Sequence, residues 1–208
     1  LEFRRVLFRS KQALNILNTM ISEYKEDGNA NIRPDEITYT SVLDAHARQG
    51  DVKGANKVFK MMKDDYKSGN SKSKPNVLTY NTIIDAWSKS KSQEAPIKAE
   101  LLLKEMVDLY LEQLDEGPNK ITYNSVINCW SKSNRPEAPH RTLDILKTMI
   151  SQYKEDGNKN IRPDEITYTS VLDAHARQGD VEGANQVLTM MKEDYRSGNK
   201  NAKLDVKR

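Results

Sequence analysis

Four basic residues recur along the chain, each at the end of the same short pattern. Arg48, for example, follows an aspartate by four residues, a threonine by eight and an isoleucine by eleven. The other three basic residues are Lys89, Lys132 and Arg177. A cation suits a phosphate, a small polar side chain suits the edge of a base, and an aliphatic side chain can pack against the face of a base. The pattern therefore indicates a surface for a polyanion with regularly spaced charges, and single-stranded nucleic acid fits it.

The other positions of the pattern are also filled consistently. The aliphatic residues are Ile37, Leu78, Ile121 and Ile166. The hydrogen-bonding residues are Thr40, Asn81, Asn124 and Thr169. The residues four before each cation are Asp44, Asp85, Asn128 and Asp173. On a helix with 100° per residue, the members of one pattern lie within about 80° of one another. We therefore expect one stripe per pattern, although cations that merely compensate the nearby aspartates would leave a similar trace.

The elements that carry these stripes form a tandem array. The patterns begin 41, 43 and 45 residues apart, and such a period is typical of solenoids. In the first full repeat, a helical period runs over residues 36–48. Gly50 and Asp51 separate it from a second amphipathic helix that starts at Val52, and Pro75 lies at the end of the repeat. The β propensity of Ile-Thr-Tyr-Thr-Ser-Val is outweighed by the helical spacing that follows it. We predict an all-α fold, a right-handed α-solenoid of stacked helix-turn-helix repeats.

The repeats divide the chain as follows: an incomplete leading repeat at 11–35, with its second helix at 11–24, then repeats at 36–76, 77–119, 120–164 and 165–205, and a tail at 206–208. Residues 1–10 do not resemble the residues that precede position 140, where a second copy of the segment starting at residue 11 begins. We expect them to be a non-native or ragged end. Residues 11–76 reappear as residues 140–205 at an offset of 129, and within residues 37–56 the copies differ only at Lys53 and Glu182. A duplicated block and two joined transcripts both explain this.

Composition narrows the class of protein. The chain is 37% hydrophobic and 30% charged, with a net charge of +3, which suits an elongated stack of amphipathic helices. Cys129 is the single cysteine, so an internal disulfide and a cysteine-based zinc site are excluded. No stretch approaches the 18 apolar residues of a membrane span, and we expect no membrane partner.

The repeated unit resembles the pentatricopeptide repeat. The resemblance rests on Ile/Leu-Thr-Tyr-Asn/Thr at the start, Asp and then Lys or Arg in the first helix, Ala and Met in the second helix, and Pro-Asp or Pro-Asn at the end. It covers about residues 11–208, and the units are longer than is usual in the family. The resemblance implies binding of single-stranded RNA, with one base per repeat read by two or three side chains.

The resemblance also assigns roles to particular residues. Each base would be read by the polar residue of the stripe and the last residue of the repeat. The pairs are Thr40 with Asn76, Asn81 with Asn119, Asn124 with Asp164, and Thr169 with Asp205. The family's pairing preference suggests 5′-A-C-U-G-3′. The four aliphatic residues, Ile37, Leu78, Ile121 and Ile166, would sandwich the bases, and Arg48, Lys89, Lys132 and Arg177 would face phosphates.

Two other functions compete with RNA binding. A protein-binding tetratricopeptide-like scaffold is also a helical hairpin array, but that family needs a small residue where Leu43, Ile84, Ile127 and Leu172 stand. An enzyme is the second alternative, because some pentatricopeptide proteins carry a nuclease domain beyond the repeats. The chain itself has no recurring nucleophile and base, and His46 and His175 replace Trp87 and Trp130 on the core side. We therefore expect a binding module without a cofactor or metal.

The resemblance further implies a cellular context. Proteins of this kind mostly act in mitochondria or chloroplasts, in RNA processing, stability or translation, and other RNA-processing proteins would be their further partners. No targeting peptide is visible in the sequence.

Overall fold

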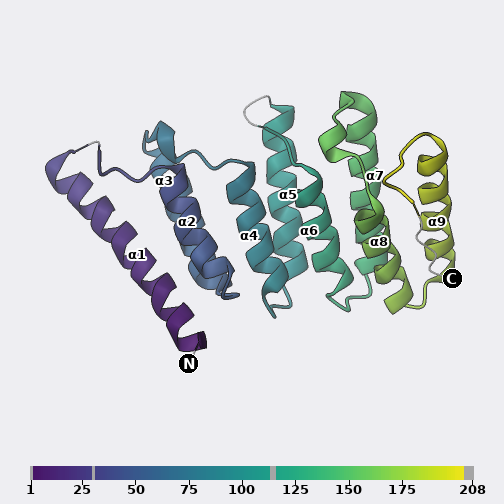
Figure 1. Ribbon diagram of the computed structural model, residues 1–208, viewed down its shortest axis with the longest axis horizontal. Coiled ribbons are helices and arrows are strands. Elements are labelled where there is room, and N and C mark those ends of the chain that lie inside the picture. The colour runs from purple at the N-terminus through teal and green to yellow at the C-terminus, as the bar shows by residue number, and fades with distance from the viewer. Residues whose placement is uncertain (1, 30, 113–115, 204–208) are drawn as a thin grey trace. The chain divides into compact units, whose positions relative to one another are not determined.

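The computed structural model describes residues 2–29, 31–112 and 116–203, and every regular element in these ranges is a helix (Figure 1). The chain divides into two compact units, Leu1–Ser92 and Gln93–Arg208. Unit 1 contains α1 (Glu2–Asp27), α2 (Glu36–Ala47), α3 (Val52–Lys67), the 3₁₀ helix η1 (Ser71–Ser73) and α4 (Val77–Lys89). Unit 2 contains α5 (Ala95–Leu111), α6 (Lys120–Ser131), α7 (Ala138–Asp156), the 3₁₀ helix η2 (Lys159–Ile161), α8 (Glu165–Arg177) and α9 (Val181–Arg196). The predicted all-α repeat architecture is confirmed.

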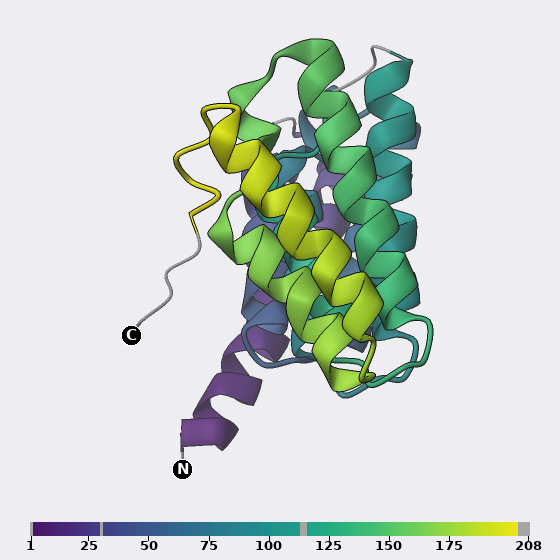
Figure 2. The same ribbon diagram turned by 90° about the vertical axis from the view of Figure 1, so that its right-hand side faces the viewer.

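Each unit is a stack in which a helix contacts its hairpin partner and the corresponding helix of the next repeat. In unit 1, α2 packs against α1, α3 and α4. In unit 2, α6 packs against α5, α7 and α8, and α8 also packs against α9. Figure 2 shows α8 and α9 side by side in the nearest hairpin. The first helices of neighbouring repeats therefore touch directly, which places their stripes next to each other within a unit.

The first helix of every repeat begins at an Asp or Asn that caps it. The cap residues are Asp35, Asn76, Asn119 and Asp164, and each accepts a hydrogen bond from the backbone N–H of the threonine three residues later. In α4, α6 and α8 the threonine hydroxyl accepts the N–H of the cap residue in return, which completes a capping box. The caps satisfy N–H groups that a helix start leaves free, so a segment rich in β-branched residues begins a helix.

The core of each unit is formed by the sides of the helices that face one another. In unit 1, Leu43 of α2, Val58 and Met62 of α3 and Ile83 and Ile84 of α4 are fully buried. The fully buried core residues of unit 2 include Ile127, Leu146, Met149, Val171, Val187 and Met191. Burying such side chains stabilises the fold by about 1.5–3 kcal/mol each. These apolar faces fix how the helices are rotated, and so fix which residues remain on the surface.

The residues that lengthen the first repeat are folded back onto it. The Asn70 amide donates to the carbonyl oxygen of Pro34 at 2.8 Å and to Oδ2 of Asp65 at 2.6 Å. Asp65 also accepts a hydrogen bond from the Tyr39 hydroxyl and pairs with Arg33. Burial, followed by the charge of Asp65, raises the pKa of Tyr39. The same network recurs in unit 2 with Asn199, Pro163, Asp194, Tyr168 and Arg162. The extra residues are thus anchored to the end of their own second helix and to the segment just before their own first helix.

A buried histidine joins the two helices of the hairpin in the first repeat. His46 is 3% exposed, and its Nδ1 lies 2.8 Å from Oδ2 of Asp51, which caps α3. The ring lies so close to Gly54 that a Cβ there would be 2.1 Å from Nδ1. His175, Asp180 and Gly183 repeat this arrangement. His46 and His175 therefore lie in the core, where the other repeats place Trp87 and Trp130.

Helix α1 is longer than the helix predicted at residues 11–24 for the incomplete leading repeat. It runs from Glu2 to Asp27 without a break at residue 10. Ser10 is buried, and its hydroxyl donates to Oε1 of Gln49 at 3.1 Å. Residues expected to lie outside the repeats are therefore continuous with the helix that packs on α2. None of the described helices is long and apolar enough to cross a bilayer.

Candidate functional site

The aliphatic residues of the four stripes are exposed although they are large and apolar. The exposed fractions are 68% for Ile37, 60% for Leu78, 62% for Ile121 and 64% for Ile166. Each lies two residues after the cap residue, in the first turn of its helix. A single exposed aliphatic side chain needs no explanation. The same exposure at the same place in four helices marks an exposed apolar position on the first helices of each unit.

In unit 1 the structure brings the predicted reading pair Thr40 and Asn76 to the same threonine. Oγ1 of Thr40 lies 3.0 Å from Oγ1 of Thr79, and Oδ1 of Asn76 accepts hydrogen bonds from the backbone N–H and the hydroxyl of Thr79. Nδ2 of Asn76 donates to Oε1 of Glu36 at 2.8 Å. The last residue of the first repeat thus caps α4 and also joins the start of that helix to the start of α2.

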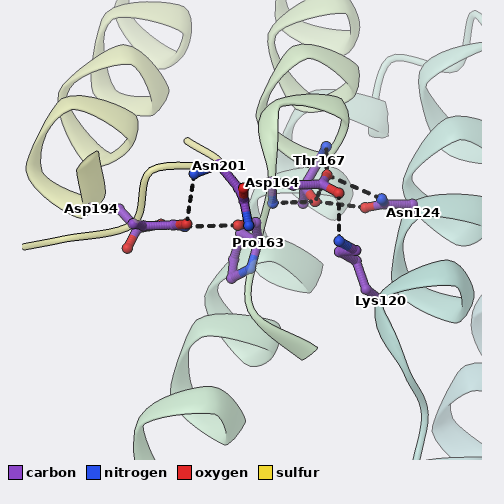
Figure 3. A network of polar contacts seen from close by, with 8 residues as sticks. Lys120, Asn124, Pro163, Asp164, Thr167, Asp194 and Asn201 are labelled. Carbon is purple, nitrogen blue, oxygen red and sulfur yellow. Dashed lines mark hydrogen bonds and ion pairs between the residues drawn. The ribbon is translucent and has the colours of Figure 1, made fainter. Parts of the chain in front are cut away.

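In unit 2 the reading pair Asn124 and Asp164 is in direct contact (Figure 3). Nδ2 of Asn124 donates to Oδ1 of Asp164 at 3.3 Å, and the Thr167 hydroxyl donates to Oδ1 of Asn124 at 2.7 Å. Oδ2 of Asp164 pairs with Nζ of Lys120 at 2.9 Å. Burial works to raise the pKa of Asp164, but Lys120 and the hydrogen bonds from Thr167 outweigh it and hold the pKa below its ordinary value. The carboxylate is therefore charged at neutral pH and accepts hydrogen bonds only.

The two remaining reading pairs are placed less completely. Asn81 is half-buried on α4 in unit 1, and Asn119 caps α6 in unit 2. Thr169 is exposed on α8. Its predicted partner, Asp205, lies outside the described residues. The roles of all eight reading residues stay predictions.

Thr40 and Thr169 occupy the same place in identical segments but differ in exposure. Thr40 is 7% exposed because it meets Thr79 of the following first helix. Thr169 is exposed, and no further first helix follows among the residues described after α9. The position is therefore covered by the next repeat when one is stacked on it.

Three of the four stripe cations are paired with the aspartate one turn earlier on the same helix. The distances are 2.6 Å from Nε of Arg48 to Oδ2 of Asp44, 2.5 Å from Nζ of Lys89 to Oδ2 of Asp85, and 2.8 Å from Nε of Arg177 to Oδ2 of Asp173. All three pairs are exposed, so each contributes little to stability. The pairing agrees with the simpler explanation that the cations compensate the aspartates, but exposed pairs also yield readily to a stronger anion.

Lys132 differs from the other three cations. The residue one turn earlier is Asn128, so the helix supplies no carboxylate there, and Lys132 is exposed. The aspartate of the next repeat, Asp173, instead accepts a hydrogen bond from Ser131 at 2.6 Å. That bond, followed by the one from Arg177, lowers the pKa of Asp173. Lys132 is therefore the stripe cation without an ion pair on its own helix, and its charge also helps to lower the pKa of Asp173 in the next repeat.

Two residues of the site were missed by the sequence reasoning. Glu36 and Lys120 each precede an exposed aliphatic residue, and each contacts the cap residue of the next first helix. The four residues at this place are Glu36, Val77, Lys120 and Glu165. These four residues include acidic, apolar and basic side chains, so the repeat pattern in the sequence does not identify the position. Among the described residues, no group of three or more His, Cys, Asp or Glu is arranged to hold a metal.

Comparisons with known proteins agree with this geometry. A family model for the pentatricopeptide repeat domain matches residues 21–90 and 153–196, and a model for the PPR repeat matches residues 121–151. Comparison with the curated proteins finds no match.

Solved structures of pentatricopeptide repeat proteins share the fold. The chain is similar to PPR10 in complex with an 18-nt psaJ RNA element, with 24% identity and a TM-score of 0.56 over 86% of this chain and 22% of that one. It is also similar to PPR10 from maize, with 22% identity and a TM-score of 0.61 over 91% of this chain and 24% of that one. The chain thus spans about a quarter of the length of these proteins or less.

Proposed function

The chain belongs to the pentatricopeptide repeat family, and on that premise we propose that it binds single-stranded RNA with one base per repeat. The observation that carries the proposal is the recurring surface of exposed aliphatic, polar and basic residues on the first helices. The similarity of the fold to PPR10, whose structure was determined with an RNA element, supports the choice of ligand. In this proposal, the chain is a binding module and not an enzyme.

In this proposal, the aliphatic residues of neighbouring repeats hold a base between them. Ile37 and Leu78 lie on α2 and α4, which pack together in unit 1, and Ile121 and Ile166 lie on α6 and α8 of unit 2. Packing of an apolar side chain against a base contributes with little regard to sequence, because every base has an apolar face. These four residues therefore supply affinity and not specificity.

Specificity comes from the reading pairs beside the aliphatic residues. Thr40 with Asn76 and Asn124 with Asp164 each meet at one threonine, so the two members of each pair lie close enough together to act on one base. With the family's pairing preference, the four repeats select 5′-A-C-U-G-3′. The last base is read by Thr169 and Asp205.

The stripe cations face the phosphates. Arg48, Lys89 and Arg177 exchange an aspartate for a phosphate oxygen on binding, whereas Lys132 has no such carboxylate to leave on its own helix. We propose that the protein acts on organellar RNA, in a mitochondrion or chloroplast, in processing, stability or translation. Other RNA-processing proteins are its further partners.

A titration of fluorescent RNA tests the proposal. The chain is titrated with RNA that contains 5′-ACUG-3′, a scrambled RNA and DNA of matched sequence, each over a series of salt concentrations. Four phosphate contacts on a single strand predict a slope of log affinity on log salt of about −3, from about −0.7 per contact. We expect tighter binding to ACUG than to the scrambled RNA, and weak binding to the DNA.

A matched variant tests reading at one position. Asn81→Thr turns the second pair into Thr with Asn, which is the pair of the first repeat, so we expect the preferred second base to change from C to A. Salt-dependent binding without sequence preference would keep the RNA surface and reject the reading pairs. Absence of RNA binding at low salt would reject the proposed function and favour a protein-binding solenoid.

A further inference from the structure

Glu36 and Lys120 occupy equivalent places and make equivalent contacts with opposite charge. Each is the first residue of a first helix and precedes the exposed aliphatic residue. Oε1 of Glu36 accepts a hydrogen bond from Nδ2 of Asn76 at 2.8 Å, and Nζ of Lys120 lies 2.9 Å from Oδ2 of Asp164. In both units, the contact reaches across to the cap residue of the next repeat, which is the second member of the reading pair.

We propose that the residue before the exposed aliphatic residue is a third specificity-determining residue, which selects the base by the charge that it places beside the reading pair. The inference rests on the proposed function, because it assumes that a base edge meets Asn76 in the first repeat and Asp164 in the third. It adds a residue to the reading pairs and predicts its effect from donor and acceptor chemistry alone.

In the third repeat, Lys120 and Asp164 form a donor and an acceptor side by side. The ammonium group has three N–H donors, of which one is directed at Oδ2 of Asp164, and Oδ2 retains acceptor capacity. Uracil presents a donor, N3–H, next to the acceptor O4, and guanine presents N1–H next to O6. Both edges complement the pair. Cytosine and adenine present an amino donor next to an acceptor nitrogen, so the amino group would face the ammonium and the ring nitrogen would face the carboxylate.

In the first repeat, Glu36 and Asn76 reverse this order. The Glu36 carboxylate only accepts hydrogen bonds, and Asn76 has one amide N–H left after donating to it. An adenine fits, because its amino group can donate to Glu36 while its N1 accepts from Asn76. Uracil and guanine would direct a carbonyl oxygen at the carboxylate. The charge at this place therefore favours A or C in the first repeat and U or G in the third, and each of these sets contains the base that the reading pair selects.

Helix stability does not explain the lysine. The first turn of a helix carries a partial positive charge, so an acidic residue there is favourable and a basic one is unfavourable. Glu36 obeys this preference at the start of α2, whereas Lys120 violates it at the start of α6. The ion pair with Asp164 is part-exposed, with side-chain exposures of 37% and 16%, and such pairs contribute little to stability. A role toward a ligand is the stronger explanation for a cation at this place.

Four RNAs that differ only at the third base, 5′-ACNG-3′, test the inference with the wild-type chain, Lys120→Met and Lys120→Arg. We expect the wild type to prefer U over C, Lys120→Met to lower that ratio about tenfold, and Lys120→Arg to retain it. With four further RNAs that differ only at the first base, 5′-NCUG-3′, the preference at the first base should be unchanged in both variants. The matched variant Glu36→Lys should instead weaken the preference for A over G at the first base and leave the third base unaffected.

The outcomes separate the inference from the proposed function. If Lys120→Met lowers affinity for all four RNAs by one factor, Lys120 is a phosphate contact and the inference is wrong. If the preference for U over C persists unchanged in Lys120→Met, Asn124 and Asp164 read the base alone and the inference is also wrong. Wild-type chain without any preference at the third base would reject base reading in the proposed function itself. Circular dichroism of each variant confirms that the helices are retained.

Discussion

Asn124 and Asp164 lie 40 residues apart in the chain, and their side chains join through a hydrogen bond of 3.3 Å. Asp164 at the same time caps α8 and pairs with Lys120 of α6. One carboxylate thus fixes the start of a helix, links two repeats and contributes to the proposed reading of a base. Stability and ligand selection are therefore coupled at this residue, and variants must be chosen to separate them.

Loss of the cap at Asp164 should destabilise unit 2. Asp164→Ala removes the acceptor for the N–H and hydroxyl of Thr167, and the expected cost is about 1 kcal/mol in the free energy of unfolding. Asp164→Asn should cost much less, because asparagine caps α4 and α6 in the same way. Urea denaturation followed by circular dichroism measures both. Equal stability of the alanine variant and the wild type would contradict the assigned capping role.

The contribution of Asp164 should also depend on pH. Its pKa in the folded chain lies below the ordinary value of 3.8. The stabilisation is therefore complete above that value and is lost as the pH falls below it through the lowered pKa. The difference in free energy of unfolding between the wild type and Asp164→Asn should be constant above about pH 5. Below about pH 4 the wild type should lose stability relative to Asp164→Asn. Urea denaturation midpoints between pH 2.5 and 6 test this.

Gly54→Ala should destabilise the first repeat, against the usual trend. Alanine in place of glycine within a helix normally stabilises by about 1 kcal/mol. Here the new Cβ would lie 2.1 Å from Nδ1 of His46 and 2.5 Å from Oδ2 of Asp51, so the buried ring must move. A loss of about 1–3 kcal/mol is expected, as for other overpacked sites. Lys53→Ala, at the exposed neighbouring position, is the control and should be close to neutral. Thermal denaturation of both variants decides the sign.

Ile121→Ala should separate binding from stability. The side chain is 62% exposed, so its truncation should change the free energy of unfolding by less than about 0.5 kcal/mol. If Ile121 packs against a base, RNA affinity should fall by about 1 kcal/mol or more, because each buried methylene group contributes about 0.8 kcal/mol. Leu101→Ala on α5 is a matched control, because that side chain is 54% exposed and lies outside the four stripes. Equal effects of the two variants on RNA affinity would reject the stacking role.

The stripe cations should differ in their contribution to affinity. Lys132→Ala should weaken RNA binding and reduce the steepness of the salt dependence by about 0.7, as expected for one phosphate contact. Asp44→Asn should strengthen binding, because it releases Arg48 from the ion pair of 2.6 Å. Fluorescence anisotropy over a salt series measures both quantities. Unchanged affinity in both variants would support the simpler explanation, in which the cations only compensate surface aspartates.

Much of the fold could be predicted because it depends on local order. The spacing of Tyr39, Leu43 and their equivalents identified a helix although Ile-Thr-Tyr-Thr favours strands, and the structure confirms the helices. The exposure of Ile37, Leu78, Ile121 and Ile166 follows from the same angular argument. The cap residues were recognised as the last residues of repeats, but their capping role emerged only in the structure.

Tertiary structure decided what each repeat does with identical residues. Thr40 and Thr169 belong to the same twelve-residue segment, yet Thr40 is buried against Thr79 whereas Thr169 is exposed. Likewise, nothing in the neighbouring sequence of Lys120 points to Asp164, which lies 44 residues later. The sequence by itself determined the helices and the face that each buries, because a helical period needs only neighbours in the chain. The contacts of a stripe residue depend on which repeat packs against it, and only the folded stack determines that.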